Sequence, residues 1–175
     1  SHCFFNQAYI RMCGVLGIFG QNCLARLEAS TTDLLHTLKG RGPDDTQFLE
    51  LSAETYLGHT RLSIRGGPEQ GRQPIVDWSG RYAMVFNGEI YNSAELAVKY
   101  LRSEVDIHGC DSRILIELFA LKRLTILDDL VGMFSVLLFD RMTNEVTLIR
   151  DRFGVKPLYY SCHNNMLVVS SIIST

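Results

Sequence analysis

The sequence of 175 residues lacks an apolar run of about 18 residues, which a membrane-spanning helix needs. It also lacks an excess of charge of one sign, because 17 Lys and Arg stand against 19 Asp and Glu and give a net charge of −2. A chain so close to neutral gives no electrostatic reason to expect nucleic acid or an anionic membrane as a partner. We therefore expect a protein that binds neither nucleic acid nor a membrane.

The sequence also lacks the residue spacing of a metal site and the features of a signal peptide. The 5 cysteines form no C-x-x-C pair, and no Cys/His cluster has the spacing of a zinc site, so no metal site is expected. Scattered cysteines in odd number are typical of reduced thiols in the cytoplasm, which is the location we expect. Residues 1–12 do not resemble a signal peptide. We expect them to be an extension that is not native or is removed, and residues 13–175 to form the functional domain.

What the sequence does contain is a mixed order of strand and helix patterns. Short apolar or alternating runs between turn residues predict strands, and apolar residues three and four apart predict helices. The later strands form hairpins, and the elements do not alternate as in a doubly wound sheet, so we expect an α+β domain with antiparallel sheets. The expected strands span 13–20, 46–51, 55–64, 81–90, 132–140, 145–151, 157–162 and 166–171, and the expected helices span 23–39, 93–102 and 111–123.

The stretch "RMCGVLGIFG" places Cys13 directly after Met12. If Met12 is the initiator and is removed, Cys13 carries both a thiol with a pKa of about 8.5 and an α-amine with a pKa of about 7.7–8.0. That amine can accept the thiol proton, as in N-terminal nucleophile enzymes, without a histidine partner. Taken alone, however, a Met–Cys pair more often marks a small buried residue in a strand.

Other residues could complete such a site. The Asn–Gly pair in "FNGEIYN" is typical of a tight turn, but the Asn87 side chain and the Gly88 N–H could also form an oxyanion hole. Arg61 in "GHTRLSI" and Asp111 in "HGCDSR" are each ordinary, as a strand arginine and a helix N-cap. Together they could bind the α-carboxylate and the α-ammonium group of an amino acid.

These stretches, together with others in the same order, resemble the glutaminase domain of class II glutamine amidotransferases, and most closely that of glutamine-hydrolysing asparagine synthetases. The resemblance covers residues 13 to about 171 and implies an N-terminal nucleophile hydrolase fold, a four-layer αββα sandwich. We expect the domain at 13–175 to be truncated at its C-terminal end and the synthetase domain to be absent. The matching stretches are "CGVLGIFG", "LKGRGPDD", "LGHTRLSI", "QPI", "VFNGEIYN", "LDDLVGMFSVLLFD" and "RDRFGVKPLYY".

The resemblance also implies a reaction and its residues. Glutamine would be hydrolysed to glutamate and ammonia through a cysteinyl thioester, and the ammonia would pass to an ATP-dependent synthetase domain that makes asparagine from aspartate. No cofactor is expected in this domain; ATP and Mg²⁺ would bind the synthetase domain, and a homodimer is compatible with the family. The implied site comprises the nucleophile Cys13, the oxyanion hole of Asn87 and Gly88, Arg61 with main-chain groups around Ser63 and Ile64 for the carboxylate, and Glu89 and Asp111 for the amino group.

Several departures from the family pattern keep a second hypothesis open. Residues 1–12 place the amine of Cys13 in a peptide bond, Arg113 stands where the family commonly has an acidic residue, and Ile172 follows Ser171 where a glutamate is usual. The loop "RGGPEQGR" is also unusual. The alternative is a non-catalytic amidotransferase-like binding module or fragment with a blocked Cys13. A hydrolase acting on another amide is a third hypothesis, disfavoured by "HTRLSI" with "NGE".

Overall fold

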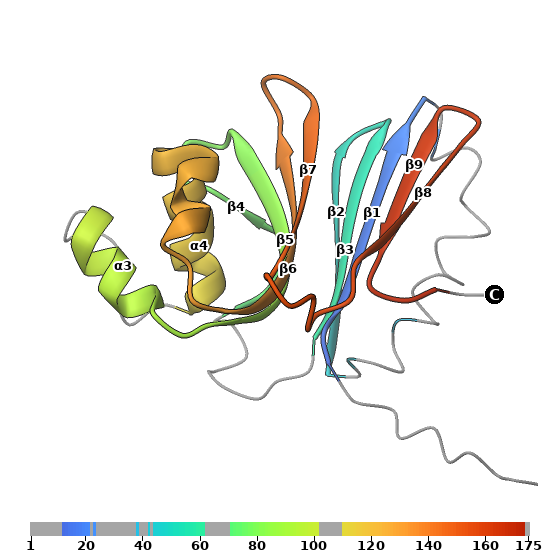
Figure 1. The fold of residues 1–175 in the computed structure, drawn as a ribbon. Helices are drawn as coiled ribbons and strands as arrows, with labels where there is room; N and C mark the ends of the chain where they lie inside the picture. The colour runs from blue at the N-terminus through green and yellow to red at the C-terminus, as the bar shows by residue number, and fades with distance from the viewer. Residues whose placement is uncertain are drawn as a thin grey trace, which may run out of the picture.

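Two antiparallel sheets packed face to face form the centre of the molecule. The computed structural model describes residues 12–21, 23, 38, 42, 44–61, 71–101 and 110–173. The five-stranded sheet has the order β2-β3-β1-β9-β8, and the four-stranded sheet has the order β4-β5-β6-β7. In Figure 1 the helix α4 lies against the four-stranded sheet, on the side away from the five-stranded sheet, and α3 lies beside α4. The α+β class with antiparallel sheets is thereby confirmed.

The elements follow the sequence patterns closely. The strands of the five-stranded sheet are β1 (Gly14–Gly20), β2 (Asp45–Ser52), β3 (Thr55–Arg61), β8 (Tyr159–His163) and β9 (Met166–Ser170). The strands of the other sheet are β4 (Ile75–Val76), β5 (Tyr82–Ile90), β6 (Gly132–Asp140) and β7 (Glu145–Arg150). The helices are α3 (Ser93–Tyr100), α4 (Asp111–Lys122) and the 3₁₀ helix η1 (Arg123–Asp128).

Side-chain alternation along the strands builds separate apolar layers. In β1, Val15 and Phe19 pack between the two sheets, whereas Leu16 and Ile18 are buried on the opposite face of the same strand. In β5, Ala83 and Val85 belong to the layer between the sheets, and the intervening residues pack under the helices. Within each of these two strands, odd-numbered and even-numbered residues therefore lie on opposite faces of the sheet.

Some sequence-based expectations need correction or fall outside the described residues. The expected helix over 23–39 lies outside them except for Cys23 and Leu38, which are both helical and buried against the outer face of the five-stranded sheet. Asp111 is the first residue of α4, and Cys110, with extended dihedral angles, is the N-cap, so the assignment of Asp111 as the cap was wrong by one position. The short strand β4 was not expected.

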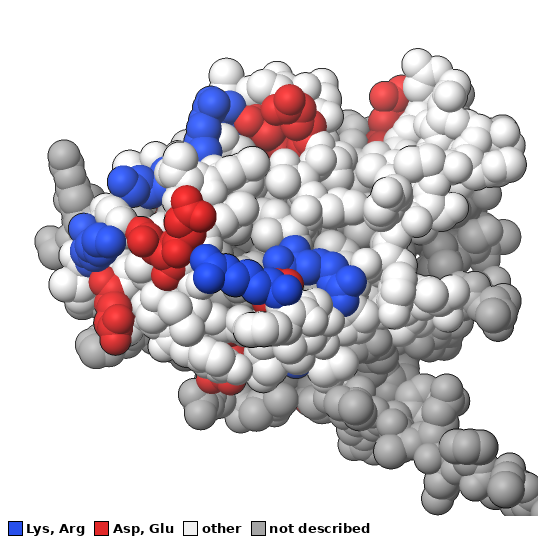
Figure 2. All heavy atoms as spheres, in the orientation of Figure 1, with Lys and Arg blue, Asp and Glu red and all other residues white. Residues whose placement is uncertain are grey.

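Charged residues of both signs share the surface. On the face seen in Figure 2, Lys and Arg side chains form a short row near the centre, and acidic side chains lie around it. This mixture matches the net charge of −2. Among the helices that the structure describes, none is long and apolar enough to cross a membrane.

Candidate active site

The start of β1 and the end of β3 bring Cys13 and Arg61 together. Gly14 pairs with Thr60 in the antiparallel ladder, so Cys13 and Arg61 are the next residues toward the same edge of the sheet. Both side chains share the face of Val15, which looks toward the four-stranded sheet. Cys13 is half-buried and Arg61 is only 8% exposed. The candidate nucleophile thus lies beside a buried guanidinium group.

Asn87 lies on the facing sheet, near the end of β5. It follows Ala83 and Val85 on the inner face and is 3% exposed. Within the described part of the chain, its side-chain nitrogen Nδ2 has no hydrogen-bond partner. An unsatisfied buried donor costs about 1–3 kcal/mol, so such a group is retained where a ligand can use it.

Gly88 follows Asn87 in a conformation that requires glycine. Its φ angle is +150°, and a Cβ atom there would lie 2.6 Å from Phe134 Cα and would also overlap the carbonyl oxygen of Met133. The close approach of β6 explains why no side chain fits at this position. The backbone N–H of Gly88 and the amide of Asn87 therefore come from adjacent residues at one end of β5.

Two carboxylates stand where β5 ends and α4 begins. Asp111 accepts hydrogen bonds from the backbone N–H groups of Ile90 at 3.1 Å and Ser112 at 2.9 Å. Burial is the largest influence on the pKa of Asp111 and raises it; the negative charge of Glu89 acts in the same direction, while the hydrogen bonds oppose it. Glu89 and Asp111 are therefore close enough for their charges to interact.

Gly71 lies between Arg61 and the start of α4, where Asp111 is found. A Cβ atom placed on Gly71 would lie 3.6 Å from Nη2 of Arg61 and 3.7 Å from Sγ of Cys110, the residue directly before Asp111. The guanidinium of Arg61 and the start of α4 thus flank the same short backbone segment. In Figure 1 the start of β1 and the ends of β3 and β5 lie along the lower edge of the molecule, as does the start of α4.

Other residues of interest lie away from this arrangement or outside the described residues. Ser63 and Ile64 are outside them. Arg113 donates to the carbonyl of Val76 at 2.8 Å and to Glu117 at 3.3 Å, so it links α4 to β4. An open depression of about 540 Å³ is found at the other end of β1, around the β8–β9 turn. Since it is far along β1 from Cys13, we do not associate it with the site.

Two inward-facing residues were missed by the sequence reasoning. His59 is 2% exposed and Ser135 is fully buried, and in the described residues their Nε2 and Oγ atoms have no hydrogen-bond partner. Burial is the main cause that lowers the pKa of His59 to about 4, and a backbone hydrogen bond to Phe86 only partly offsets it. The signal for His59 was its position two residues before Arg61, which places both on one face of a strand.

The comparison with known proteins agrees with the arrangement of the candidate site. The model of a glutamine amidotransferase domain family matches residues 12–175. This chain belongs to that family. The amidotransferase domain is 35% identical over 171 residues to asparagine synthetase [glutamine-hydrolyzing] 2 of Bacillus subtilis (strain 168), with 94% of this chain and 22% of the relative covered. It is 31% identical to asparagine synthetase B [glutamine-hydrolyzing] of Escherichia coli (strain K12), with 92% and 29% covered.

The structural comparison supports the same fold. The glutamine phosphoribosylpyrophosphate amidotransferase of B. subtilis, complexed with ADP and GMP, superposes with a TM-score of 0.66 at 20% identity, over 91% of this chain and 42% of that one. The family resemblance and the N-terminal nucleophile hydrolase fold are therefore confirmed, and the chain is an amidotransferase domain. It spans less than a third of the length of the two curated synthetases.

Proposed function

We propose that this amidotransferase domain hydrolyses the side-chain amide of L-glutamine to glutamate and ammonia, with Cys13 as the nucleophile. The observation that carries the proposal is the buried Nδ2 of Asn87, a donor without a partner in the described residues, on the inner face opposite the strand that follows Cys13. A donor held in this way is suited to the negative charge that develops on an amide oxygen under attack.

The charged residues at the edge of the site fit the two charged groups of an amino acid. The fork of Arg61 binds the α-carboxylate, with main-chain groups around Ser63 and Ile64 as additional donors. Asp111 and Glu89, which are close enough for their charges to interact, accept from the α-ammonium group. This pairing selects a zwitterion and leaves the side-chain amide to reach Cys13.

The reaction uses atoms of one residue as nucleophile and base. The thiol of Cys13 gives its proton to the α-amine of the same residue, and the sulfur attacks the amide carbon. The oxyanion is stabilised by Nδ2 of Asn87 and the N–H of Gly88. The C–N bond then breaks as the proton passes from the amine to the nitrogen, ammonia leaves, and water hydrolyses the thioester. The amine must be unblocked, so the proposal includes removal of residues 1–12, with the functional domain beginning at Cys13.

The names of the relatives indicate the destination of the ammonia. Because the two synthetases are much longer than this chain and are named for asparagine synthesis, we propose a synthetase domain or subunit that uses ATP and Mg²⁺ to make asparagine from aspartate. The same proposal places the protein in the cytoplasm and is compatible with a homodimer.

Glutamine turnover by two forms of the protein tests this function. The form that begins at Cys13 is expected to release equal amounts of glutamate and ammonia, whereas the form that retains residues 1–12 and the Cys13→Ala variant are expected to release neither. Full activity with residues 1–12 in place would refute the amine as base. If the folded protein that begins at Cys13 binds glutamine without releasing ammonia, the result would instead support a non-catalytic binding module. In the form that retains residues 1–12, the amine of Cys13 is part of a peptide bond, and this favours the same alternative.

A further inference from the structure

We propose that His59, Ser135 and Asn87 form a polar cluster between the sheets that divides the substrate amide between its members: Asn87 donates to the oxyanion, whereas His59 and Ser135 bind the amide nitrogen and then the ammonia released from it. This inference rests on the proposed glutaminase function and assigns a position to the leaving group. We call these side chains the inner polar cluster.

The inner polar cluster contains the buried side-chain nitrogen and oxygen atoms that lack a partner in the described residues: Nε2 of His59, Nδ2 of Asn87 and Oγ of Ser135. The exposed fractions of the residues are 2%, 3% and 0%. They come from β3, β5 and β6, so they are not a local feature of one strand. Buried polar groups are normally hydrogen-bonded, and a group of exceptions points to a bound small polar molecule.

Strand register places the members of the cluster near one another. Asn87 and Ser135 are direct partners in the β5–β6 ladder, so their Cβ atoms are about 4.5–5.5 Å apart on the same face. His59 belongs to the other sheet, but its side chain lies near enough to the backbone of Phe86, the residue before Asn87, for that backbone to raise the pKa of His59. The imidazole therefore bridges the space between the two sheets at Asn87.

The same register brings the cluster to Cys13. Val15 pairs with His59 in the β1–β3 ladder, so Cys13 is diagonal to His59 on the same face, at about 7–8 Å by strand geometry. Arg61 lies two residues beyond His59, toward the edge of the sheet. A glutamine held at the edge by Arg61 would extend its amide past Cys13 toward the inner polar cluster.

The hydrogen-bonding capacity of the cluster fits a neutral nitrogen. Burial lowers the pKa of His59 to about 4 and so favours the neutral ring, and Nε2, the atom without a partner in the described residues, carries a lone pair in the tautomer protonated at Nδ1. The hydroxyl of Ser135 can accept or donate. An amide NH₂ group and ammonia both donate to such acceptors, whereas an ammonium ion would find no carboxylate among these three side chains. The cluster therefore favours ammonia in its neutral, nucleophilic form.

Hydroxylamine provides a test, because it resembles ammonia and attacks the thioester in place of water. The attack forms a C–N bond, breaks the C–S bond, and yields γ-glutamyl hydroxamate with the regenerated thiol. The ratio of hydroxamate to glutamate depends only on how the thioester is consumed, and not on how fast the thioester forms. In the protein that begins at Cys13, the rate at which preformed thioester yields hydroxamate is expected to saturate with hydroxylamine concentration, as binding at a site requires.

The variants are chosen to test the inner acceptor of His59. His59→Asn keeps a polar side chain near the backbone of Phe86 but is too short to place an acceptor at the position of Nε2, whereas His59→Gln keeps an acceptor there. At subsaturating hydroxylamine, His59→Asn and Ser135→Ala are each expected to lower the ratio by about 5–10-fold, the usual effect of one lost hydrogen bond. His59→Gln is expected to restore most of it. Ser161→Ala, in the exposed strand β8, is the matched control and should leave the ratio unchanged.

The outcomes distinguish this inference from the function on which it rests. If the rate of hydroxamate formation from preformed thioester rises linearly without saturation, and the ratio is the same in the unsubstituted protein, His59→Asn and Ser135→Ala, the inner polar cluster is overturned as a nitrogen site while the glutaminase stays intact. Absence of both hydroxamate and glutamate in the unsubstituted protein would refute the proposed function itself. Ser135→Ala removes a single oxygen, so it keeps the test decisive if a His59 variant does not fold.

Discussion

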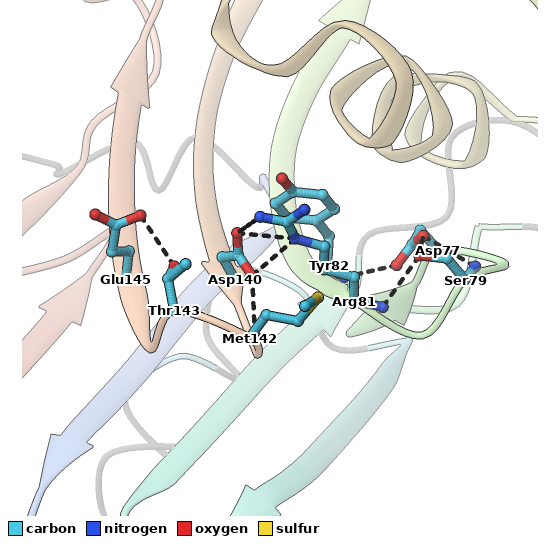
Figure 3. A network of polar contacts seen from close by, with 8 residues as sticks. All are labelled: Asp77, Ser79, Arg81, Tyr82, Asp140, Met142, Thr143 and Glu145. Atoms are coloured by element: carbon cyan, nitrogen blue, oxygen red, sulfur yellow. Dashed lines mark hydrogen bonds and ion pairs between the residues drawn. The ribbon is translucent and has the colours of Figure 1, made fainter.

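Replacement of Asp140 by Asn should reveal how strongly one ion pair holds the four-stranded sheet, at the end opposite the site. Nε of Arg81 donates to both carboxylate oxygens of Asp140 at 3.0 Å, and Nη2 donates to one of them at 2.6 Å (Figure 3). The backbone N–H of Met142 adds a bond of 2.9 Å. The hydrogen bonds from Arg81 are the main cause that lowers the pKa of Asp140 from 3.8 to about 2.

The magnitude follows from linkage between protonation and folding. The lower pKa of Asp140 corresponds to roughly 2 kcal/mol at most, before any screening by solvent. Because the Arg81 side chain is 25% exposed, solvent and salt screen the pair, and we expect Asp140→Asn to lower the free energy of unfolding by about 1–2 kcal/mol at pH 7. For a domain of this size, the midpoint of thermal unfolding should fall by roughly 2–8 °C.

The dependence on pH gives the decisive measurement. The pKa of Asp140 is lower in the folded than in the unfolded state, so its stabilisation is present above the unfolded pKa and is lost as pH falls through about 2. At pH 3 about half of it should remain. Urea denaturation of both proteins at pH 7, 4 and 3 should show the difference shrinking, with the exposed Asp128→Asn as a control that changes little. An equal difference at every pH would refute the ionic origin of the stabilisation.

Further substitutions test the site and the core. Asn87→Ala should lower kcat for glutamine by about 100–1000-fold, since one oxyanion donor is lost, with little change in KM. Asp111→Asn should raise the KM for glutamine at least about tenfold in steady-state assays. In the unsubstituted protein, KM should begin to rise on acidification at a higher pH than an ordinary aspartate would cause, because burial raises the pKa of Asp111. In urea denaturation, Gly88→Ala should lower the free energy of unfolding by at least about 2 kcal/mol through overlap with the β6 backbone, and Leu137→Ala, fully buried between the sheets, by about 2–5 kcal/mol.

The sequence predicted the strands and α4 well because each carries a regular apolar pattern. Strand β5 was expected over 81–90 and spans Tyr82–Ile90, and α4 was expected over 111–123 and spans Asp111–Lys122. Each of these patterns lies within one element, whereas the proximity of Cys13 and Arg61 depends on the antiparallel pairing of β1 with β3. Patterns of this kind are local, so one chain suffices to read them.

What could not be read from sequence depends on contacts between distant segments. The inner position of Ser135 is determined by the sheet that packs on it, and nothing near it in sequence indicates that its hydroxyl lacks a partner. The two-residue strand β4 is too short to carry a pattern, and its pairing with Met84 and Ala83 defines it. The N-cap shifted from Asp111 to Cys110 because the carboxylate bonds to Ile90 as well as to its own helix.

Strand β1 has one neighbour from early in the chain and one from very late. It pairs with β3 on one side and with β9 on the other, and Ser171 exchanges hydrogen bonds with Val15 across 156 positions of sequence. During synthesis on the ribosome, the strand that follows Cys13 must therefore wait with one edge uncovered until Ser170 has emerged. Contacts between such distant residues form slowly. On the proposal that Cys13 becomes the first residue, this delay is the period in which an aminopeptidase would reach it, before the sheet around it is complete.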